Sequence, residues 1–154
     1  NLLFATLAPT SRRIRLPEGT ECVLTDTVGF IRDLPKELLG AFEATLEEAH
    51  EADVLLLVAD ASHPQLEAQL QSVERILREH ELHERPHLLV LNKVDAVTDF
   101  ATVRELARHR NALLTSTLDR RGIVELMERL EDALGAPPRR QGRGQTAEMW
   151  SPLD

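Results

Sequence analysis

Apolar and polar residues alternate with two different periods along the chain, and each period predicts a kind of element. Two short runs, "RRIRL" and "ECVLTDT", flank the turn-like "PEGT" and predict a hairpin of strands. The continuous apolar runs "DVLLLVAD" and "HLLVLN" have the length of strands and are typical of parallel strands buried on both faces. A further strand is expected at "ALLTS".

Apolar residues spaced by three and four predict helices between these strands. One helix begins at Pro35, and the next follows Ser62 as its cap, with Pro64 in its first turn. The stripes that mark the helices are Leu39, Phe42, Leu46 and Ala49; Leu66, Leu70, Val73 and Leu77; a helix around Phe100 to His109; and Ile123, Leu126, Leu130 and Leu134. Strands that alternate with helices predict an α/β sheet.

Ligands of such sheets bind at the carboxyl ends of the strands. The residues expected at these ends are Asp26, Asp60, Asn92 and Ser116. Three of the four belong to recognisable motifs, so the carboxyl edge is where we expect chemistry.

Composition and charge narrow the setting. A chain of 154 residues with 42% apolar content is long enough for one domain, expected over 1–135. Cys22 cannot form an internal disulfide and is expected to be a buried thiol in a cytoplasmic protein. No apolar run approaches the ~18 residues that span a bilayer. The formal charge of -8 argues against binding of free DNA or RNA.

Residues 136–154 contain Pro, Gly and polar residues without periodicity, and they predict a disordered tail. This segment is slightly basic from Arg139 onward, and an RNA-touching tail is the alternative interpretation. Trp150 could make a partner contact there, although nothing else in the sequence supports one.

The sequence "NKVD", Asn92 to Asp95, directly follows a predicted buried strand. The Asp95 carboxylate can accept hydrogen bonds from both N1–H and the N2 amine of guanine, a pair that adenine does not offer. Asn92 is suited to bond the base and tie neighbouring loops, and the stem of Lys93 to cover the ring. Such sites reject an analogue lacking the donors by roughly 10⁴ to 10⁵. A plain polar turn is the alternative, because four residues also match by chance.

Two more strand ends carry compatible signals. In "DTVG", Asp26 can hold Mg²⁺ through water, and Gly29 lets a backbone N–H approach a terminal phosphate. The spacing to "NKVD" leaves room for a helix, a strand, a helix and a strand, as in a GTPase domain. The short "TSTL" follows the last strand, where the backbone N–H of Ser116 is expected to face the guanine oxygen.

The segments "LFATLAPTSRRIRLPEG", "LLTDTVGFIRDLPKELLGAFEATLEEAHEADVLLLVADASHP" and "LLVLNKVD" resemble the GTPase domain of the HflX family of ribosome-associated GTPases. The resemblance covers about residues 2–135, and "DTVGFIRDLP" is its most specific part. It implies a Ras-like P-loop GTPase fold with a doubly wound, mostly parallel sheet. It also implies GTP and GDP as ligands, Mg²⁺ as cofactor and GTP hydrolysis as the reaction. The implied partner is the large ribosomal subunit, and members are implicated in splitting or rescuing stalled ribosomes.

The resemblance assigns residues motif by motif. The first switch corresponds to Phe4, Ala5, Thr6, Leu7 and Ala8, in which Thr6 senses Mg²⁺ and the γ-phosphate and Thr10 is the rival for that role. The second switch corresponds to Asp26, Thr27, Val28 and Gly29. The base is read by Asn92, Lys93, Val94 and Asp95, and the last base contact comes from Ser116, Thr117 and Leu118. Family members usually carry Ala in place of Thr117, a departure we expect to be tolerated because a backbone N–H makes the contact.

Phe30 occupies the position where many GTPases have a glutamine that orients the attacking water. A phenylalanine cannot hydrogen-bond water, so the catalytic group stays unidentified. Slow intrinsic hydrolysis with stimulation by a partner is expected. Packing of Phe30 against the sheet is the simpler alternative, and both roles are compatible.

The phosphate-binding motif G-x-x-x-x-G-K-[ST] does not occur in the sequence. None of the seven glycines leads into Lys-Ser or Lys-Thr. Truncation explains this better than divergence, because the family carries the loop just before the first switch. In the Ras-like order, the strand feeding that loop lies between the strands that end at Asp26 and Asp60. We therefore expect a central gap in the sheet and weak or absent GTP binding by this chain alone.

Three functions fit these observations. The first is part of a ribosome-associated GTPase, expected to be a cytoplasmic monomer whose ribosome contacts lie mostly in a region outside this chain. The second is a non-hydrolysing interaction module with a degenerate GTPase fold. The third is another GTPase with a hydrophobic residue at position 30 and a different partner.

Overall fold

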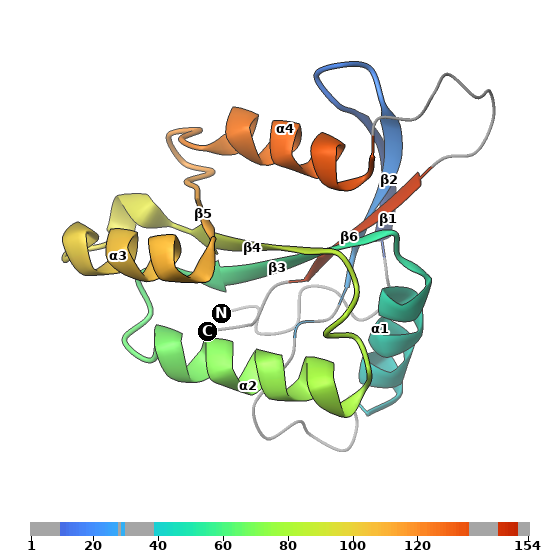
Figure 1. Cartoon of the computed structure of the whole chain (residues 1–154), viewed down its shortest axis with the longest axis horizontal. Coiled ribbons are helices and arrows are strands. Elements are labelled where there is room, and N and C mark those ends of the chain that lie inside the picture. Colours follow the sequence, from blue (N-terminus) through green and yellow to red (C-terminus); the bar gives the residue numbers. More distant parts are fainter. Residues whose placement is uncertain (1–9, 28, 30–38, 136–144, 151–154) are drawn as a thin grey trace.

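The computed structural model describes residues 10–27, 29, 39–135 and 145–150, and its elements follow the predicted alternation of strands and helices (Figure 1). The strands are β1 (Thr10–Arg15), β2 (Glu21–Asp26), β3 (Val54–Asp60), β4 (His87–Asn92), β5 (Leu113–Leu114) and β6 (Gln145–Trp150). The helices are α1 (Leu39–Glu51), α2 (Leu66–Glu79), α3 (Phe100–Arg110) and α4 (Ile123–Ala133), with a 3₁₀ turn η2 (Val94–Ala96). The expected start of the first helix at Pro35 lies outside the described residues.

The strands form one sheet in the order β1-β2-β6-β3-β4-β5. Only β1 pairs in the antiparallel sense, with β2, and every other described pair is parallel. Among the described helices, α4 covers one face of the sheet, and α1, α2 and α3 pack on the other. The predicted α/β fold with a doubly wound, mostly parallel sheet is confirmed.

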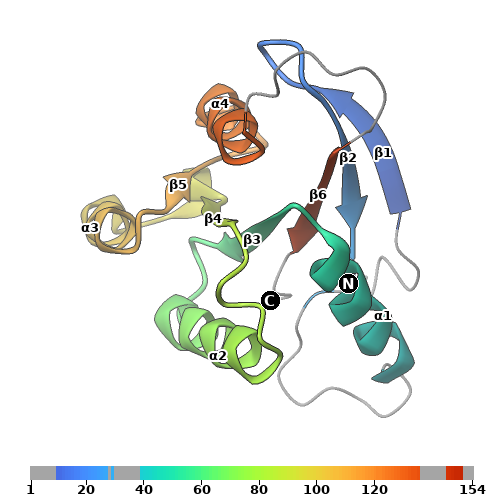
Figure 2. The same ribbon diagram turned by 45° about the vertical axis from the view of Figure 1, so that its right-hand side comes forward.

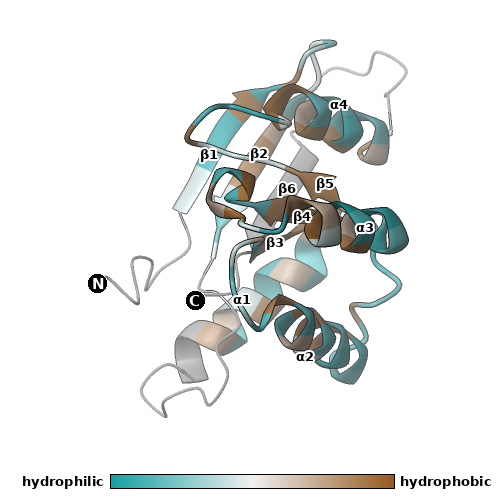
Figure 3. Cartoon of the chain, turned by 90° about the vertical axis from the view of Figure 1, so that its left-hand side faces the viewer, coloured by the Kyte–Doolittle hydropathy of each residue, from teal (hydrophilic) through white to brown (hydrophobic). Residues whose placement is uncertain are grey.

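The apolar run of β3 places side chains on both faces of the sheet, as a central parallel strand requires. Leu55 and Leu57 pack with α1 and α2, whereas Val54 and Leu56 pack toward α4. All four side chains are at most 6% exposed. Figure 3 shows this apolar character concentrated on the sheet and on the inner sides of the helices.

Helix α2 carries the predicted apolar stripe, and Leu66, Leu70, Val73 and Leu77 are all buried. Its beginning differs from the prediction, because the helix starts at Leu66 and Ser62 does not cap it. Both the backbone N–H and the Oγ of Ser62 donate to Asp60 Oδ1, at 2.8 and 2.6 Å. The hydroxyl therefore turns back to the strand end instead of forward to the helix.

Strand β6 corrects two expectations. Gln145–Trp150 was expected in a disordered tail, but it forms a strand between β2 and β3, parallel to both (Figure 2). The expected central gap in the sheet is therefore filled. A gap would leave the facing N–H and C=O groups of β2 and β3 unpaired. Residues 145–150 have a weak strand pattern, but their backbone hydrogen bonds to both neighbouring strands offset it. The rest of the tail, 136–144 and 151–154, lies outside the described residues.

Helix α4 is joined to the β1–β2 turn by a buried carboxylate. Glu131 is 4% exposed, and its two oxygens accept from the backbone N–H groups of Glu18 and Thr20 at 2.8 and 2.9 Å. Burial opposes the charged form, but these hydrogen bonds outweigh it and hold the pKa of Glu131 below its usual value. Cys22 is fully buried nearby, as predicted, and burial followed by the charge of Glu131 raises the pKa of its thiol.

Candidate functional site

The loop after β4 is tied to the loop after β5 by hydrogen bonds from Thr115. Its Oγ1 donates to Asn92 Oδ1 at 3.1 Å, and its backbone N–H donates to the Leu91 carbonyl at 2.9 Å. The Val94 N–H in turn donates to the Thr115 carbonyl at 3.1 Å. Thr115 is 1% exposed, so these bonds are shielded from water. Asn92 thereby fixes the position of its loop against the neighbouring one.

A second contact between these loops orients Asp95. The hydroxyl of Ser116, which is fully buried, donates to Asp95 Oδ1 and also accepts from the Asp119 N–H at 3.3 Å. The carboxylate of Asp95 belongs to an exposed residue and retains further lone pairs. One edge of the carboxylate is thus held by the protein, while the residue faces solvent.

The backbone N–H of Ser116 is engaged differently from the expectation. It donates to the Arg121 carbonyl at 2.9 Å, which closes the turn over 116–121, so it does not face a guanine oxygen in this structure. The physical reason is the short return of the chain to α4, which brings that carbonyl back onto the end of β5. Thr117 and Leu118 follow in the same turn and are exposed, Leu118 by 82%.

Lys93 joins the end of β4 to the end of β3. Its backbone adopts the left-handed conformation with φ 64°, and its Nζ lies 2.6 Å from Asp60 Oδ2. Asp60 and Asn92 are register partners at the carboxyl ends of their strands. The Asp60 side chain is only 11% exposed, so the ion pair restrains Lys93 within the predicted base-reading motif.

Sequence reasoning placed Asp60 at the sheet edge but in no motif, and it missed Thr115 altogether. The strand-end position of Asp60 was the only available signal. The position of Thr115 directly after β5 gives no such signal, because its role depends on the neighbouring loop.

The predicted second switch begins at the end of β2, apart from this cluster. Asp26 ends the strand, Thr10 is its register partner on β1, and both Thr27 and Gly29 are buried. In the sheet order β2 lies two strands from β3, which corresponds to roughly 10 Å between strand axes. The predicted site residues that the structure describes therefore lie at one edge of the sheet as two separate groups.

Asp26 has the donor chemistry that Mg²⁺ requires. This ion prefers oxygen ligands and is usually held by one or two carboxylates together with water and substrate phosphates. Within the described ranges no three His, Cys, Asp or Glu side chains gather to hold a metal by themselves. A single carboxylate at a strand end fits a phosphate-dependent Mg²⁺ site better than a closed metal centre.

Part of the predicted site cannot be placed. Phe4 to Ala8, including Thr6, and also Val28 and Phe30 lie outside the described residues. Of the two candidates for sensing Mg²⁺, Thr10 is described, and it stands beside Asp26 in the β1–β2 pairing.

Known proteins are similar to this chain in sequence and in fold. The sequence model of the family described as "50S ribosome-binding GTPase" matches residues 1–93, more than half of the chain. The chain belongs to this family of 50S ribosome-binding GTPases. The match includes β1 to β4 and ends at Lys93.

Curated relatives of this chain are GTPases of the HflX type. The chain is 42% identical over 132 residues to the GTPase HflX of Alkalihalophilus pseudofirmus, covering 86% of this chain and 30% of the relative. It is 42% identical over 134 residues to that of Escherichia coli and 44% over 134 residues to that of Magnetococcus marinus, covering 32% and 31% of those proteins. The predicted HflX resemblance is confirmed, and the chain spans about a third of the length of these relatives.

A solved structure, that of a mutation variant of SsGBP, is also similar to this chain. It has a TM-score of 0.64 and 30% sequence identity, and the similarity covers 79% of this chain and 46% of the other. No helix in the described part of the chain is both long and apolar enough to cross a bilayer.

Proposed function

We propose that this chain is the guanine-reading part of a ribosome-associated, GTP-hydrolysing protein. The observation that carries the proposal is the pre-formed contact between the two base-reading loops, in which Ser116 holds one oxygen of Asp95 and Thr115 holds Asn92. Both loops stand at the carboxyl edge of a parallel sheet, where ligands of this architecture bind. The family match and the HflX relatives support the same function.

In this proposal the Asp95 carboxylate accepts the N1–H and N2–H groups of guanine. The hydrogen bond from Ser116 fixes the carboxylate before the base arrives, which reduces the loss of side-chain freedom on binding. The stem of Lys93 covers the ring face, and its ion pair with Asp60 restrains the side chain. The last base contact then comes from the turn at Thr117 and Leu118, since the Ser116 N–H donates to Arg121.

Asp26 and Gly29 serve the phosphate end in this proposal, with Asp26 bound to Mg²⁺ through water and Thr6 as a second contact. When bound, Mg²⁺ neutralises charge that develops on the phosphate oxygens. Gly29 presents its backbone N–H to the γ-phosphate, and Phe30 leaves the attacking water to be positioned by backbone groups, by a switch residue or by the ribosome. Hydrolysis is therefore slow without the large ribosomal subunit, with ribosome splitting or rescue as the cellular role in the cytoplasm.

Base reading is tested by titrating the isotope-labelled chain with GMP and with AMP and following amide shifts by NMR. We expect GMP to shift the resonances of 92–95 and 116–118, and AMP to leave them nearly unchanged. Asp95→Asn removes this preference, whereas Asp119→Asn, the same change in a carboxylate of the neighbouring loop, keeps it. Retained GMP preference in Asp95→Asn would show that another group reads the base.

A non-hydrolysing module is the second candidate, and two observations favour it for this chain taken alone. The sequence contains no G-x-x-x-x-G-K-[ST], and β6 holds the sheet position that the Ras-like order gives to the strand feeding that loop. We therefore expect weak or no GTP binding by the isolated chain in calorimetry. Tight binding of GTP with Mg²⁺ would contradict this expectation.

Co-sedimentation with large ribosomal subunits, with GTP or GDP supplied at concentrations high enough to occupy a weak site, separates the two candidates. A GTPase whose switches report the γ-phosphate sediments more with GTP than with GDP, while a non-hydrolysing module sediments equally with both. Phe30→Ala then tests stimulation, because loss of ribosome-stimulated turnover alone would indicate partner docking through that side chain.

A further inference from the structure

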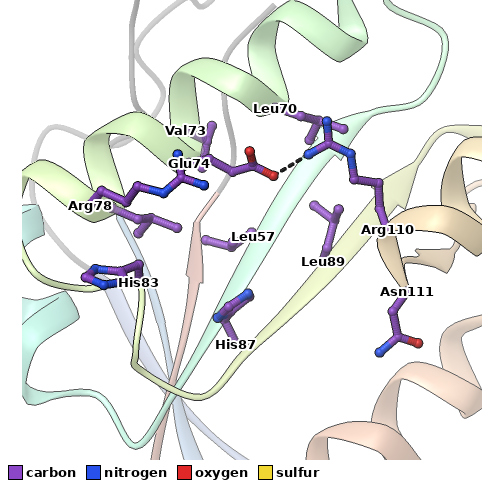
Figure 4. A pocket seen from close by; sticks show the side chains of 11 residues that line it. Leu57, Leu70, Val73, Glu74, Arg78, His83, His87, Leu89, Arg110 and Asn111 are labelled. Carbon is purple, nitrogen blue, oxygen red and sulfur yellow. Dashed lines mark hydrogen bonds and ion pairs between the residues drawn. The ribbon is translucent and has the colours of Figure 1, made fainter.

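A pocket of about 360 Å³ opens between α2, the start of β4 and the end of α3 (Figure 4). Its lining is largely apolar, with Leu57 and Leu89 of the strands as the floor and Leu70, Val73 and Leu77 of α2 facing them. Leu57 and Leu89 are register partners three residues before Asp60 and Asn92, which places the floor ~10 Å from the carboxyl edge. The pocket is therefore separate from the base-reading loops.

The rim of this pocket carries two guanidinium groups from different elements. Arg110 at the end of α3 forms an ion pair with Glu74 of α2, and both side chains are partly shielded from water. Arg78, one turn beyond Glu74 on α2, makes no side-chain hydrogen bond or ion pair among the described residues. Figure 4 shows both guanidinium groups reaching toward Glu74 from opposite sides, with Leu57 and Leu89 below them.

Two histidines complete the rim. His83 precedes β4, and His87 begins it, with its Nδ1 2.9 Å from the Arg85 carbonyl. Even with both rings neutral, two arginines and one glutamate leave the rim with a net charge of +1 (2 − 1), in a chain whose formal charge is -8. An anion at this place is attracted locally although the chain as a whole repels it.

We propose that this pocket binds a small organic anion with an apolar body and one carboxylate. The volume is near the lower end of the ~300–1000 Å³ found for ligand pockets, which fits a fragment-sized molecule. The apolar body covers the floor at Leu57 and Leu89, and the carboxylate accepts hydrogen bonds from Arg78, whose planar guanidinium suits such a group. This inference is independent of the proposed nucleotide chemistry, since it uses none of the same side chains.

The probes are four compounds titrated into the isotope-labelled chain and followed by NMR. They are 4-phenylbutyrate, its neutral amide 4-phenylbutyramide, the cation 4-phenylbutylamine, and inorganic phosphate as an anion without an apolar body. We expect 4-phenylbutyrate to shift the resonances of the lining residues and to bind ~3- to 10-fold tighter than the amide, the scale of one partly exposed charged contact. The amine and phosphate should bind more weakly than both.

Variants test which groups provide the selectivity. Arg78→Gln keeps a polar hydrogen-bond donor but shortens the side chain and removes its charge, and it should lower the affinity for 4-phenylbutyrate to that for the amide. Arg75→Gln is the matched control, because Arg75 lies on the same helix, pairs with Glu79 and does not line the pocket. Leu89→Phe fills the floor and should weaken both the carboxylate and the amide, with circular dichroism confirming that the variant is folded.

Three results would overturn the proposal. The first is the absence of shifts at the lining residues with any probe. The second is equal affinity for carboxylate and amide. The third is unchanged carboxylate binding in Arg78→Gln together with lowered stability, which would show that Arg78 serves only the carboxyl end of α2.

Discussion

Two glycines with nearly the same positive φ stand in opposite surroundings, and they offer a matched test of the turn that precedes α4. Gly122 before α4 has φ +69°, and Gly135 after it has φ +70°. A Cβ added at Gly122 would lie 2.0 Å from the Leu114 carbonyl oxygen, whereas one at Gly135 would meet nothing within 4 Å. We predict that Gly122→Ala destabilises the chain clearly more than Gly135→Ala.

The expected magnitudes follow from two separate costs. Placing alanine in the left-handed region costs ~1–2 kcal/mol at either position. At Gly122 the oxygen is also about 1 Å closer than the 3.0 Å that Cβ atoms tolerate, so backbone must move, which adds ~1–3 kcal/mol as in overpacked cores. We therefore expect a loss of ~2–5 kcal/mol for Gly122→Ala and ~1–2 kcal/mol for Gly135→Ala.

The assay is urea unfolding followed by circular dichroism, with an unchanged m-value as the sign that the same surface unfolds. Asparagine variants provide the control, because asparagine tolerates positive φ but still carries a Cβ. Gly135→Asn should recover most of the stability lost in Gly135→Ala, and Gly122→Asn should recover little. Equal losses at the two positions would refute the reasoning, since they would show that backbone conformation alone determines the cost.

Other expectations concern the core and the buried carboxylate. Leu82→Ala removes a side chain that is fully buried between α1, α2 and β3 and should cost ~2–5 kcal/mol in urea unfolding. Glu131→Gln should lower the urea midpoint, because the amide offers a single neutral acceptor to the Glu18 and Thr20 N–H groups. Since the pKa of Glu131 is lowered in the folded chain, its stabilisation is complete above the usual glutamate value and is lost as pH falls through the lowered one. A series of urea midpoints from pH 7 to 3 should thus fall less steeply in Glu131→Gln than in the unchanged chain, and equal slopes would contradict the assignment.

The sequence predicts much of this fold because its signals are local. The run "DVLLLVAD" has the composition of a strand buried on both faces, and β3 occupies Val54–Asp60 within one residue of it. The stripe of α2 is likewise visible from its spacing. The prediction that Ser62 caps α2 is wrong, because the Ser62 hydroxyl donates to the Asp60 carboxylate at the end of β3 instead. Sequence spacing alone does not decide whether a serine bonds to a strand-end carboxylate or to the start of a helix.

The candidate site also has residues that the sequence predicts and contacts that it does not. Asn92 and Asp95 are recognisable because guanine recognition requires an amide and a carboxylate at fixed spacing after a strand. The ion pair of Lys93 with Asp60 and the hydrogen bond from Thr115 join residues 33 and 23 positions apart, so they depend on strand register rather than on local pattern. The use of the Ser116 N–H by Arg121 depends on the shape of a turn that no motif describes.

Strand β6 also determines the order in which the sheet can be completed during synthesis. It is the last of the described strands along the chain, yet it pairs Thr146 with Val23 and Met149 with Leu56, across separations of 123 and 93 residues. The β1–β2 hairpin and the β3–β4–β5 layer can form earlier, because their pairings are closer in sequence, but each then presents an open strand edge. The two parts become one sheet only after residues 145–150 have been synthesised, so a nascent chain that ends before them is exposed to edge-to-edge association.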